Sequence, residues 1–428
     1  MSQTMNTTDS SDEPTQALVP KLRFPEFREA GEWEQQTLQQ VSTALIDGDW
    51  IESKDQSDSG YRLIQTGNIG IGEFIAKSGK ERFVSLATFE RLRCTEIFPG
   101  DCLVSRLPDP AGRSCVVPDI GVKMITAVDC MIVRLDKSKI VPSLYISRSQ
   151  TDSYFREVAT LTSGSTRQRI SRDNLSTLRL TLPPSLPEQA RIADCLSSLD
   201  ELLAAQARKV EALKTHKKGL MEQLFPREGE TQPRLRFPEF RDAGEWITMP
   251  LGNAATFYNG RAYKQEELLE SGKYTVLRVG NFFTNNSWYH SDLELDETKY
   301  CDTGDLLYAW SASFGPRIWG GAKVIYHYHI WKVVEHRDIL RRFLFIVLEN
   351  ETEQMKANSA NGLGLLHITK GTIEAWQASF PPPAEQARIA DCLSSLDDLI
   401  AAEAHTHEAL KTHKKGLMQQ LFPTPAED

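Results

Sequence analysis

The feature that most constrains the fold of this sequence is an internal repeat. Two segments each occur twice, and the residues between the copies differ. Leu22–Phe27 reads LRFPEF, and Leu235–Phe240 reads LRFPEF again. Glu188–Pro226 and Glu385–Pro423 are a second repeated pair, and they differ at only seven aligned positions. The segments between the repeats, about 41–183 and 254–380, share almost no residue identity. Because solenoid repeats recur every ~20–50 residues, this longer spacing predicts duplicated half-proteins, in which two near-identical elements carry two different modules.

The second repeated pair has the apolar spacing of a long coiled-coil helix. Its apolar positions alternate in steps of four and three, which is a heptad pattern sustained over about five repeats. Pro183, Pro184 and Pro187 should prevent any earlier segment from continuing into the first helix, and we expect Pro226 and Pro423 to end the two helices. The predicted interface positions are Ile192, Leu196, Leu199, Leu203, Leu213 and Leu220 in the first copy and Ile389, Leu393, Leu396, Ile400, Leu410 and Leu417 in the second.

Two such helices in one chain most simply pair with each other. We predict an antiparallel coiled coil, with polar positions such as Gln206 and Lys217 selecting register and orientation at some cost in stability. The alternative is that each helix packs separately on its own module. Separate packing would not require the heptad phase to be held for so long, so the sequence favours the coiled coil.

The two variable modules have the pattern of an α+β fold rich in short strands. Strand-like runs are separated by Gly, Pro and Asp, and landmarks such as Gly100-Asp101 and Gly304-Asp305 recur in the same order. We therefore predict one fold with two different surfaces, as part of a pseudo-twofold internal repeat. The predicted segments are a disordered tail (1–19), a first module (20–183), a first helix (184–226), a linker (227–232), a second module (233–380), a second helix (381–423) and a short tail (424–428).

Composition limits the classes of protein that are possible. The net charge of −9 argues against a protein that simply coats nucleic acid, so any DNA binding must come from local basic loops or from additional subunits. No apolar run approaches the ~20 residues of a membrane span, and residues 1–19 lack the basic and apolar regions of a signal peptide. The seven cysteines include no C-x-x-C pair, which favours a reduced, cytoplasmic location without a zinc site.

The residues at the module–helix boundaries resemble those of a known family. The first boundary has Pro183-Pro184, Pro187-Glu188-Gln189 and Arg191-Ile192-Ala193, and the second repeats it from Pro381-Pro382 to Arg388-Ile389-Ala390. With the Gly-Asp-x-Leu landmark and the Leu-Met-Glu-Gln-Leu-Phe-Pro ending at Pro226, the chain closely resembles the specificity subunit of type I restriction–modification systems. The resemblance covers about residues 20–423.

This resemblance implies a specific set of partners. It implies two target-recognition domains, each reading one half of a bipartite site in double-stranded DNA, and two helices that separate them. It also implies two methyltransferase (modification) subunits and two restriction (translocase and nuclease) subunits. S-adenosylmethionine, ATP and Mg²⁺ are then used by those partners, and no cofactor is bound by this chain.

The chain lacks the sequence patterns of an enzyme that modifies or cuts DNA. Neither Pro-Pro site fits the Asn/Asp-Pro-Pro-aromatic loop of an amino-methyltransferase, and no G-x-x-x-x-G-K-[ST] phosphate loop occurs. A metal-dependent nuclease needs clustered carboxylates, and the fragment Glu297-x-Lys299 has no matching partner upstream. We therefore predict no catalytic and no metal-binding residues.

Candidate DNA contacts are loop side chains that can reach base edges, because arginine pairs with guanine and glutamine with adenine. Ser163–Arg172 concentrates such donors beside Gly164, and the alternative is that its arginines cap a helix or pair with carboxylates. Arg317 lies among aromatic residues that are equally typical of a core. The candidates are Arg106, Arg113, Arg167, Gln168, Arg169 and Arg172 in the first module and Lys264, Arg278, Arg317 and His367 in the second.

Two other functional interpretations remain open at this level. One is a self-contained restriction or modification enzyme, which the missing motifs disfavour. The other is a coiled-coil scaffold whose variable lobes bind protein partners. Co-purification distinguishes the three, because only a DNA-specificity subunit requires a methyltransferase partner.

Overall fold

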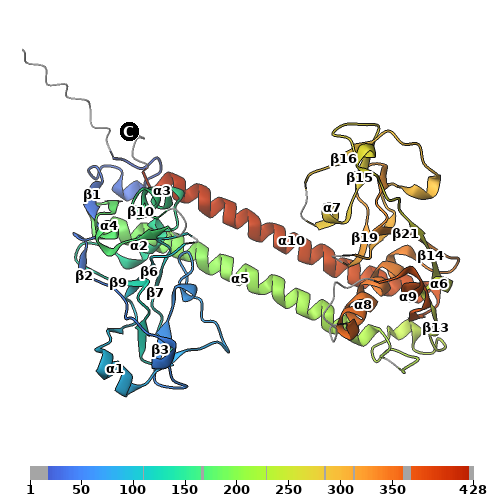
Figure 1. Cartoon of the computed structure of the whole chain (residues 1–428), viewed down its shortest axis with the longest axis horizontal. Coiled ribbons are helices and arrows are strands. Elements are labelled where there is room, and N and C mark those ends of the chain that lie inside the picture. Colours follow the sequence, from blue (N-terminus) through green and yellow to red (C-terminus); the bar gives the residue numbers. More distant parts are fainter. Residues whose placement is uncertain are drawn as a thin grey trace, which may run out of the picture. The chain divides into compact units, whose positions relative to one another are not determined.

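The chain forms two compact units, each built around one variable module (Figure 1). Unit 1 comprises residues 1–207 and 405–428, and unit 2 comprises residues 208–404. Each unit therefore contains one end of each long helix. The structure, a computed structural model, describes residues 18–108, 110–164, 168–227, 229–283, 286–311, 314–359 and 368–423.

The module of unit 1 contains two four-stranded sheets. The first is antiparallel, in the order β2-β9-β6-β7. The second has the order β4-β3-β8-β5 and includes the parallel pair β3 and β8. The strands are β2 (Ser42–Ile46), β3 (Tyr61–Ile64), β4 (Phe83–Val84), β5 (Glu96–Ile97), β6 (Cys102–Ser105), β7 (Ser114–Val116), β8 (Met124–Thr126) and β9 (Cys130–Leu135).

The module of unit 2 repeats this topology strand for strand. Its antiparallel sheet has the order β14-β21-β18-β19, and its mixed sheet has the order β16-β15-β20-β17 with β15 and β20 parallel. The strands are β14 (Ala255–Asn259), β15 (Tyr274–Leu277), β16 (Tyr289–Ser291), β17 (Tyr300–Cys301), β18 (Leu306–Ala309), β19 (Gly315–Ile318), β20 (Val324–Tyr326) and β21 (Ile330–Glu335). The prediction of one α+β fold with two different surfaces is confirmed.

Short strands and helices complete both modules. A two-stranded sheet precedes each long helix, β1 (Glu34–Thr37) with β12 (Arg179–Leu182) in unit 1 and β13 (Ile247–Pro250) with β22 (Gln377–Phe380) in unit 2. Unit 1 also has the hairpin β10 (Thr162–Ser163) and β11 (Arg169–Ile170). The shorter helices are α1 (Leu86–Leu92), α2 (Pro142–Arg148), α3 (Asp152–Thr160), α4 (Arg172–Ser176), α6 (Leu251–Ala254), α7 (Val279–Phe283), α8 (Arg341–Ser359) and α9 (Lys370–Ala375).

The two long helices are α5 (Leu186–Leu224) and α10 (Pro383–Leu421), and they pack together within each unit. In unit 1 Lys414 pairs with Asp200 at 2.5 Å, and in unit 2 Lys217 pairs with Asp397 at 2.7 Å. Late residues of one helix thus meet early residues of the other, so the antiparallel arrangement is confirmed. Every predicted interface position is buried or half-buried, namely Ile192, Leu196, Leu199, Leu203, Leu213, Leu220, Ile389, Leu393, Leu396, Ile400, Leu410 and Leu417.

Prolines lie at the ends of both long helices. Helix α5 begins at Leu186, after Pro183 and Pro184, and Pro187 lies in its first turn. Proline is tolerated there because the backbone N–H that it lacks would have no partner within the helix. The C-terminal ends agree with the prediction, since α5 stops two residues before Pro226 and α10 stops two residues before Pro423.

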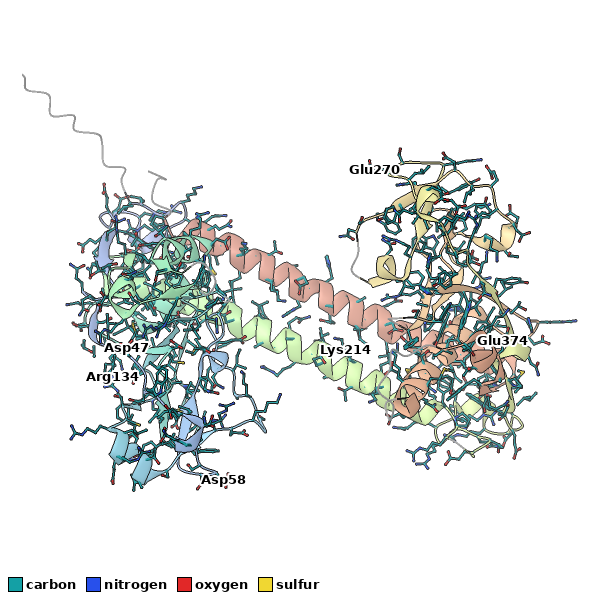
Figure 2. The ribbon with its side chains drawn as sticks, in the orientation of Figure 1. Asp47, Asp58, Arg134, Lys214, Glu270 and Glu374 are labelled. Atoms are coloured by element: carbon teal, nitrogen blue, oxygen red, sulfur yellow. The ribbon has the colours of Figure 1, made fainter. Side chains whose placement is uncertain are left out.

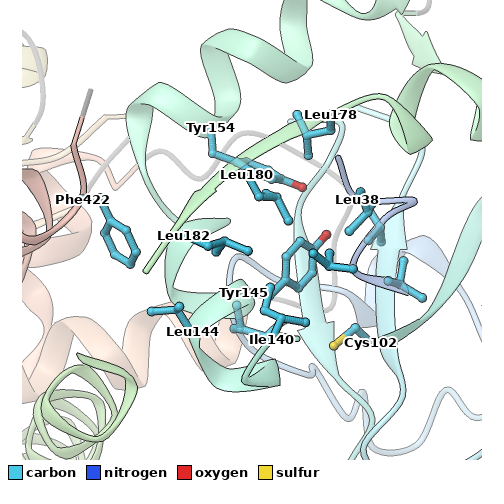
Figure 3. Packing of buried hydrophobic residues seen from close by; sticks show 14 of the residues in the cluster. Leu38, Cys102, Ile140, Leu144, Tyr145, Tyr154, Leu178, Leu180, Leu182 and Phe422 are labelled. Atoms are coloured by element: carbon cyan, nitrogen blue, oxygen red, sulfur yellow. The ribbon is translucent and has the colours of Figure 1, made fainter. Parts of the chain in front are cut away.

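Each unit has a hydrophobic core in which the module and both long helices take part. In unit 1, Tyr145 and Tyr154 lie fully buried between Leu38 and the strand β12 (Figure 3). Phe422, which follows α10, packs into the same cluster. In unit 2, Phe225 after α5 stacks on Phe343 at 5.7 Å between ring centroids. The module and the helices therefore fold as one body within each unit.

A buried ion pair joins each repeated LRFPEF segment to the start of a long helix. Arg23 forms two hydrogen bonds with the Glu188 carboxylate, at 2.7 and 2.8 Å, and these raise the pKa of Arg23. Arg236 and Glu385 make the same pair in unit 2, at 2.8 and 2.7 Å. Both carboxylates are only 1% exposed. In both units the repeated LRFPEF segment is therefore bound to the start of a repeated long helix.

Removing one partner of this buried pair should destabilise the unit that contains it. We expect Arg23→Ala to lower the free energy of unfolding of unit 1 by about 3–5 kcal/mol, because Glu188 would remain buried without a counter-charge. The control is Lys411→Ala, whose partner Glu408 is exposed and whose loss should cost about 1 kcal/mol or less. Urea titration followed by tryptophan fluorescence measures both, and equal midpoint shifts would contradict the prediction.

Candidate nucleic-acid interface

The arginine-rich loop of unit 1 is presented by the hairpin of β10 and β11. Its strands pair Thr162 with Ile170 and Ser163 with Arg169. Gln168 is exposed, and Arg169 is about half exposed beside it. Arg167 lies outside the described residues. The hairpin therefore places neighbouring amide and guanidinium groups at the surface, which is the geometry that base-edge contacts require.

Two aspartates that sequence reasoning missed hold these arginines in place. Asp129, in the turn between β8 and β9, forms an ion pair with Arg169 at 2.7 Å. Asp47, labelled in Figure 2, pairs with Arg106 at 2.5 Å and lies 3.6 Å from Arg172. These partners come from segments far apart in the chain, so no local pattern could have identified them. Fixing each guanidinium in advance lowers the entropy lost when it binds a base.

Arg106 and Arg113 point into the protein. Arg106 is buried, and its Nε donates to the carbonyl oxygen of Ile170 at 3.0 Å. Arg113 donates to four backbone carbonyl groups, including those of Ile69 at 2.7 Å and Thr66 at 3.1 Å. Both arginines brace the loop between β6 and β7 against neighbouring segments. Contact of either residue with DNA stays a prediction. In this structure their guanidinium groups form hydrogen bonds with backbone carbonyl oxygens of the protein.

The predicted residues of unit 2 are spread over its module. Arg317 is exposed on β19, and Lys264 is exposed and lies 3.9 Å from Glu266. Arg278 is half-buried, with its guanidinium 4.2 Å from the centre of the Tyr289 ring. His367 lies outside the described residues. Arg278 acts electrostatically on His327, and Tyr263, the residue before Lys264, stacks on the same ring at 6.4 Å between ring centroids.

At the place that Asp129 occupies in unit 1, unit 2 carries aromatic and imidazole side chains. The backbone N–H of Arg106 donates to the backbone carbonyl oxygen of Asp129 at 2.8 Å, and that of Trp310 donates to the backbone carbonyl oxygen of His329 at 3.1 Å, so the two turns are equivalent. Trp310 and His329 lie 5.0 Å apart between ring centroids, and Tyr328 and His329 lie 3.9 Å apart. Tyr328 is 38% exposed. The two modules thus present different chemistry at one position of the same fold.

The charge at this turn of unit 2 also differs from that at the equivalent turn of unit 1, where Asp129 and Arg169 form an ion pair. Burial lowers the pKa of His327 to about 4, and the neighbouring His329 and Arg278 contribute to the shift. The His327 ring is therefore neutral at neutral pH. Sequence reasoning missed this turn, although its Tyr326–His329 sequence, YHYH between two strands, is a visible signal. Neutral rings favour stacking and apolar contacts over phosphate binding.

Among the described residues, no group of three or more His, Cys, Asp or Glu side chains could hold a metal ion. No helix within them combines the length and apolar character that crossing a membrane requires.

Comparison with known proteins places this architecture in a family. The family model described as the type I restriction modification DNA specificity domain matches the chain twice, over residues 30–215 and 243–412. A Methanocaldococcus jannaschii protein bearing the name of the type I restriction enzyme MjaX specificity subunit is 23% identical over 402 residues, or 91% of this chain and 93% of that protein. The MjaVIII specificity subunit of the same organism is 24% identical over 314 residues, or 68% of this chain and 72% of that protein.

Solved structures share the fold. A chain from a structure of the type I R-M system matches with a TM-score of 0.58 and 16% identity, covering 91% of this chain and 97% of that chain. The S subunit from M. genitalium matches with a TM-score of 0.55 and 15% identity, covering 95% and 99%. The duplicated family match spans most of the sequence, and the chain belongs to the type I restriction–modification DNA specificity family, as a specificity subunit with two target-recognition domains.

Proposed function

We propose that each module reads one half of a bipartite DNA site and that the paired helices set the distance between the halves. The observation that supports this most directly is the contrast between the equivalent turns. One carries Asp129 with Arg169, and the other carries His329 with Trp310 and Tyr328. A duplicated fold with two chemically different surfaces suits the reading of two unrelated short sequences.

The partners proposed for the chain are two methyltransferase subunits and, for cleavage, two restriction subunits. S-adenosylmethionine, ATP and Mg²⁺ would be bound by those subunits, and a cytoplasmic location follows from that chemistry. The support lies on the long helices, where Leu202 and its counterpart Leu399 are 47% and 41% exposed. Two equal apolar positions, each within a nearly identical helix, fit two copies of one partner better than two different partners.

Reconstitution with the methyltransferase subunit tests this proposal. The chain alone should transfer no methyl group to DNA, and addition of the partner should give methylation at a bipartite site. Leu202→Asp should leave one methyltransferase bound per chain, and Leu202→Asp with Leu399→Asp should leave none, as measured by light scattering.

The matched control is Leu86→Asp, which changes a leucine on α1 of the module that is 57% exposed. It should leave two methyltransferase subunits bound. Two bound subunits on the double variant would show that the docking surface lies elsewhere, and methyl transfer by the pure chain would overturn the non-catalytic assignment.

A further inference from the structure

Unit 1 contains a cavity of about 580 Å³ where α3 begins beside the last turns of α10. One wall is the start of α3, from the N-cap residue Thr151 through Ser153 to Arg156. The opposite wall belongs to α10, with Lys411, Lys414 and Lys415. A cavity of this volume accommodates a small anion together with water.

The lining of this cavity is strongly basic, although the whole chain carries a net charge of −9. Lys414 and Lys415 are paired with Asp200 and Asp152. Lys21 and Arg156 also line the cavity, and within the described part of the chain neither forms an ion pair. Positive charge therefore exceeds negative charge here, and the N-terminus of the nine-residue helix α3 adds to it.

A buried arginine behind the wall points to a ligand independently of the lysines. Arg148 is 2% exposed, and within the described residues it forms no ion pair and its Nε has no hydrogen-bond partner. Its guanidinium donates to the Thr151 hydroxyl and to Ser153 Oγ, the latter at 2.9 Å. Burial of a cation without an ion-pair partner is costly, and the charge of Glu157 offsets only part of that cost. The Thr151 hydroxyl already donates to the Arg148 carbonyl oxygen at 2.8 Å, so an anion bound by Ser153 Oγ would offset the remainder.

We propose that this cavity binds a phosphate group, with Ser153 as a neutral donor polarised by Arg148 and with Arg156 and Lys415 as charged donors. The phosphate could come from the DNA backbone or from free phosphate. The backbone is favoured because α3 leads directly into the hairpin of β10 and β11. Nine helical residues span about 14 Å, close to the ~12 Å width of the major groove, so the hairpin could read bases while α3 reaches a flanking phosphate. This choice of source rests on the proposed reading function of the hairpin.

Unit 2 lacks this site and therefore provides a matched control. Lys414 contacts Gln150 in unit 1 and Lys217 contacts Glu349 in unit 2, which fixes the correspondence of the two modules. By that correspondence, Arg148 and Arg156 are replaced by Val347 and Met355. Lys218 is the sequence counterpart of Lys415.

The test compares Arg156→Gln, Ser153→Ala and Lys415→Gln with the control Lys218→Gln in the full chain assembled with its methyltransferase partner. Affinity for duplex DNA is measured over a series of KCl concentrations. Losing one charged phosphate contact, in Arg156→Gln or Lys415→Gln, should lower the salt slope by about 0.9 and the affinity by about fivefold at ~0.15 M salt, on every DNA sequence alike. Ser153→Ala removes a neutral donor, so it should lower the affinity and leave the salt slope unchanged. The recognised sequence should not change, which separates failure of this site from failure of half-site reading.

A second arm measures the melting temperature of the full chain in inorganic phosphate and in chloride at equal ionic strength. Stabilisation by phosphate that is lost in Ser153→Ala, with no change in the DNA salt slope of Arg156→Gln or Lys415→Gln, supports the phosphate site with free phosphate as its source. A lower salt slope in Arg156→Gln and Lys415→Gln supports the DNA backbone as the source. The proposal is overturned if neither arm changes, if Lys218→Gln lowers the slope equally, or if the variants lose only the methyltransferase subunit.

Discussion

Replacing Arg167, Gln168 and Arg169 with alanine should abolish or relax recognition of one half of the DNA target and leave the other half unchanged. Gln168 and Arg169 lie exposed at the hairpin of unit 1, and Asp129 holds Arg169 in position. Each bidentate base contact that is lost should cost ~1–3 kcal/mol of discrimination. Mapping methylated sites across a genome, with the reconstituted complex, measures both halves at once.

The reciprocal experiment changes the other module. Tyr328→Ala with His329→Ala should alter only the second half-site. These rings lie at the turn of unit 2 that is equivalent to the turn of Asp129 in unit 1. Arg28→Ala removes an exposed arginine outside both clusters and should change neither half. A change in both halves after either set of substitutions would show that the modules do not read independently.

Lengthening both long helices should widen the gap between the half-sites while each half keeps its sequence. Equal numbers of residues separate Asp200 from Lys217 on α5 and Asp397 from Lys414 on α10, so both helices must grow together to keep both ion pairs. Four residues inserted after Ala205 and four after its counterpart Ala402 add ~6 Å, against 3.4 Å per base pair, which predicts a spacer longer by about one to two base pairs.

The length of the insertion matters because it also rotates the helix. Four residues turn a helix by about 400°, so the heptad seam stays nearly in phase, whereas two residues turn it by about 200° and direct polar side chains to the interface. The two-residue variant should therefore be destabilised. In the four-residue variant, binding to the original site should fall toward the non-specific level, a difference of about 4–10 kcal/mol. An unchanged spacer in a folded, active variant would show that the helices do not set the distance.

Repetition and heptad spacing were sufficient to predict the architecture. Landmarks such as Gly100-Asp101 and Gly304-Asp305 recur in the same order, and both modules have one topology. The seam of α5 and α10 follows from apolar spacing alone, because helical periodicity is a local property of the sequence.

Which side chains form the reading surface was decided by tertiary structure. The sequence could predict that Gln168 and Arg169 lie on a surface loop, because Gly164 and the polar residues around them are typical of one. It could not predict that Asp129 holds Arg169, or that the donors of Arg113 are used by backbone carbonyl groups. Local patterns fix the conformation of a segment, whereas the partner of a long, flexible guanidinium depends on which distant segments the packed core brings within hydrogen-bond distance.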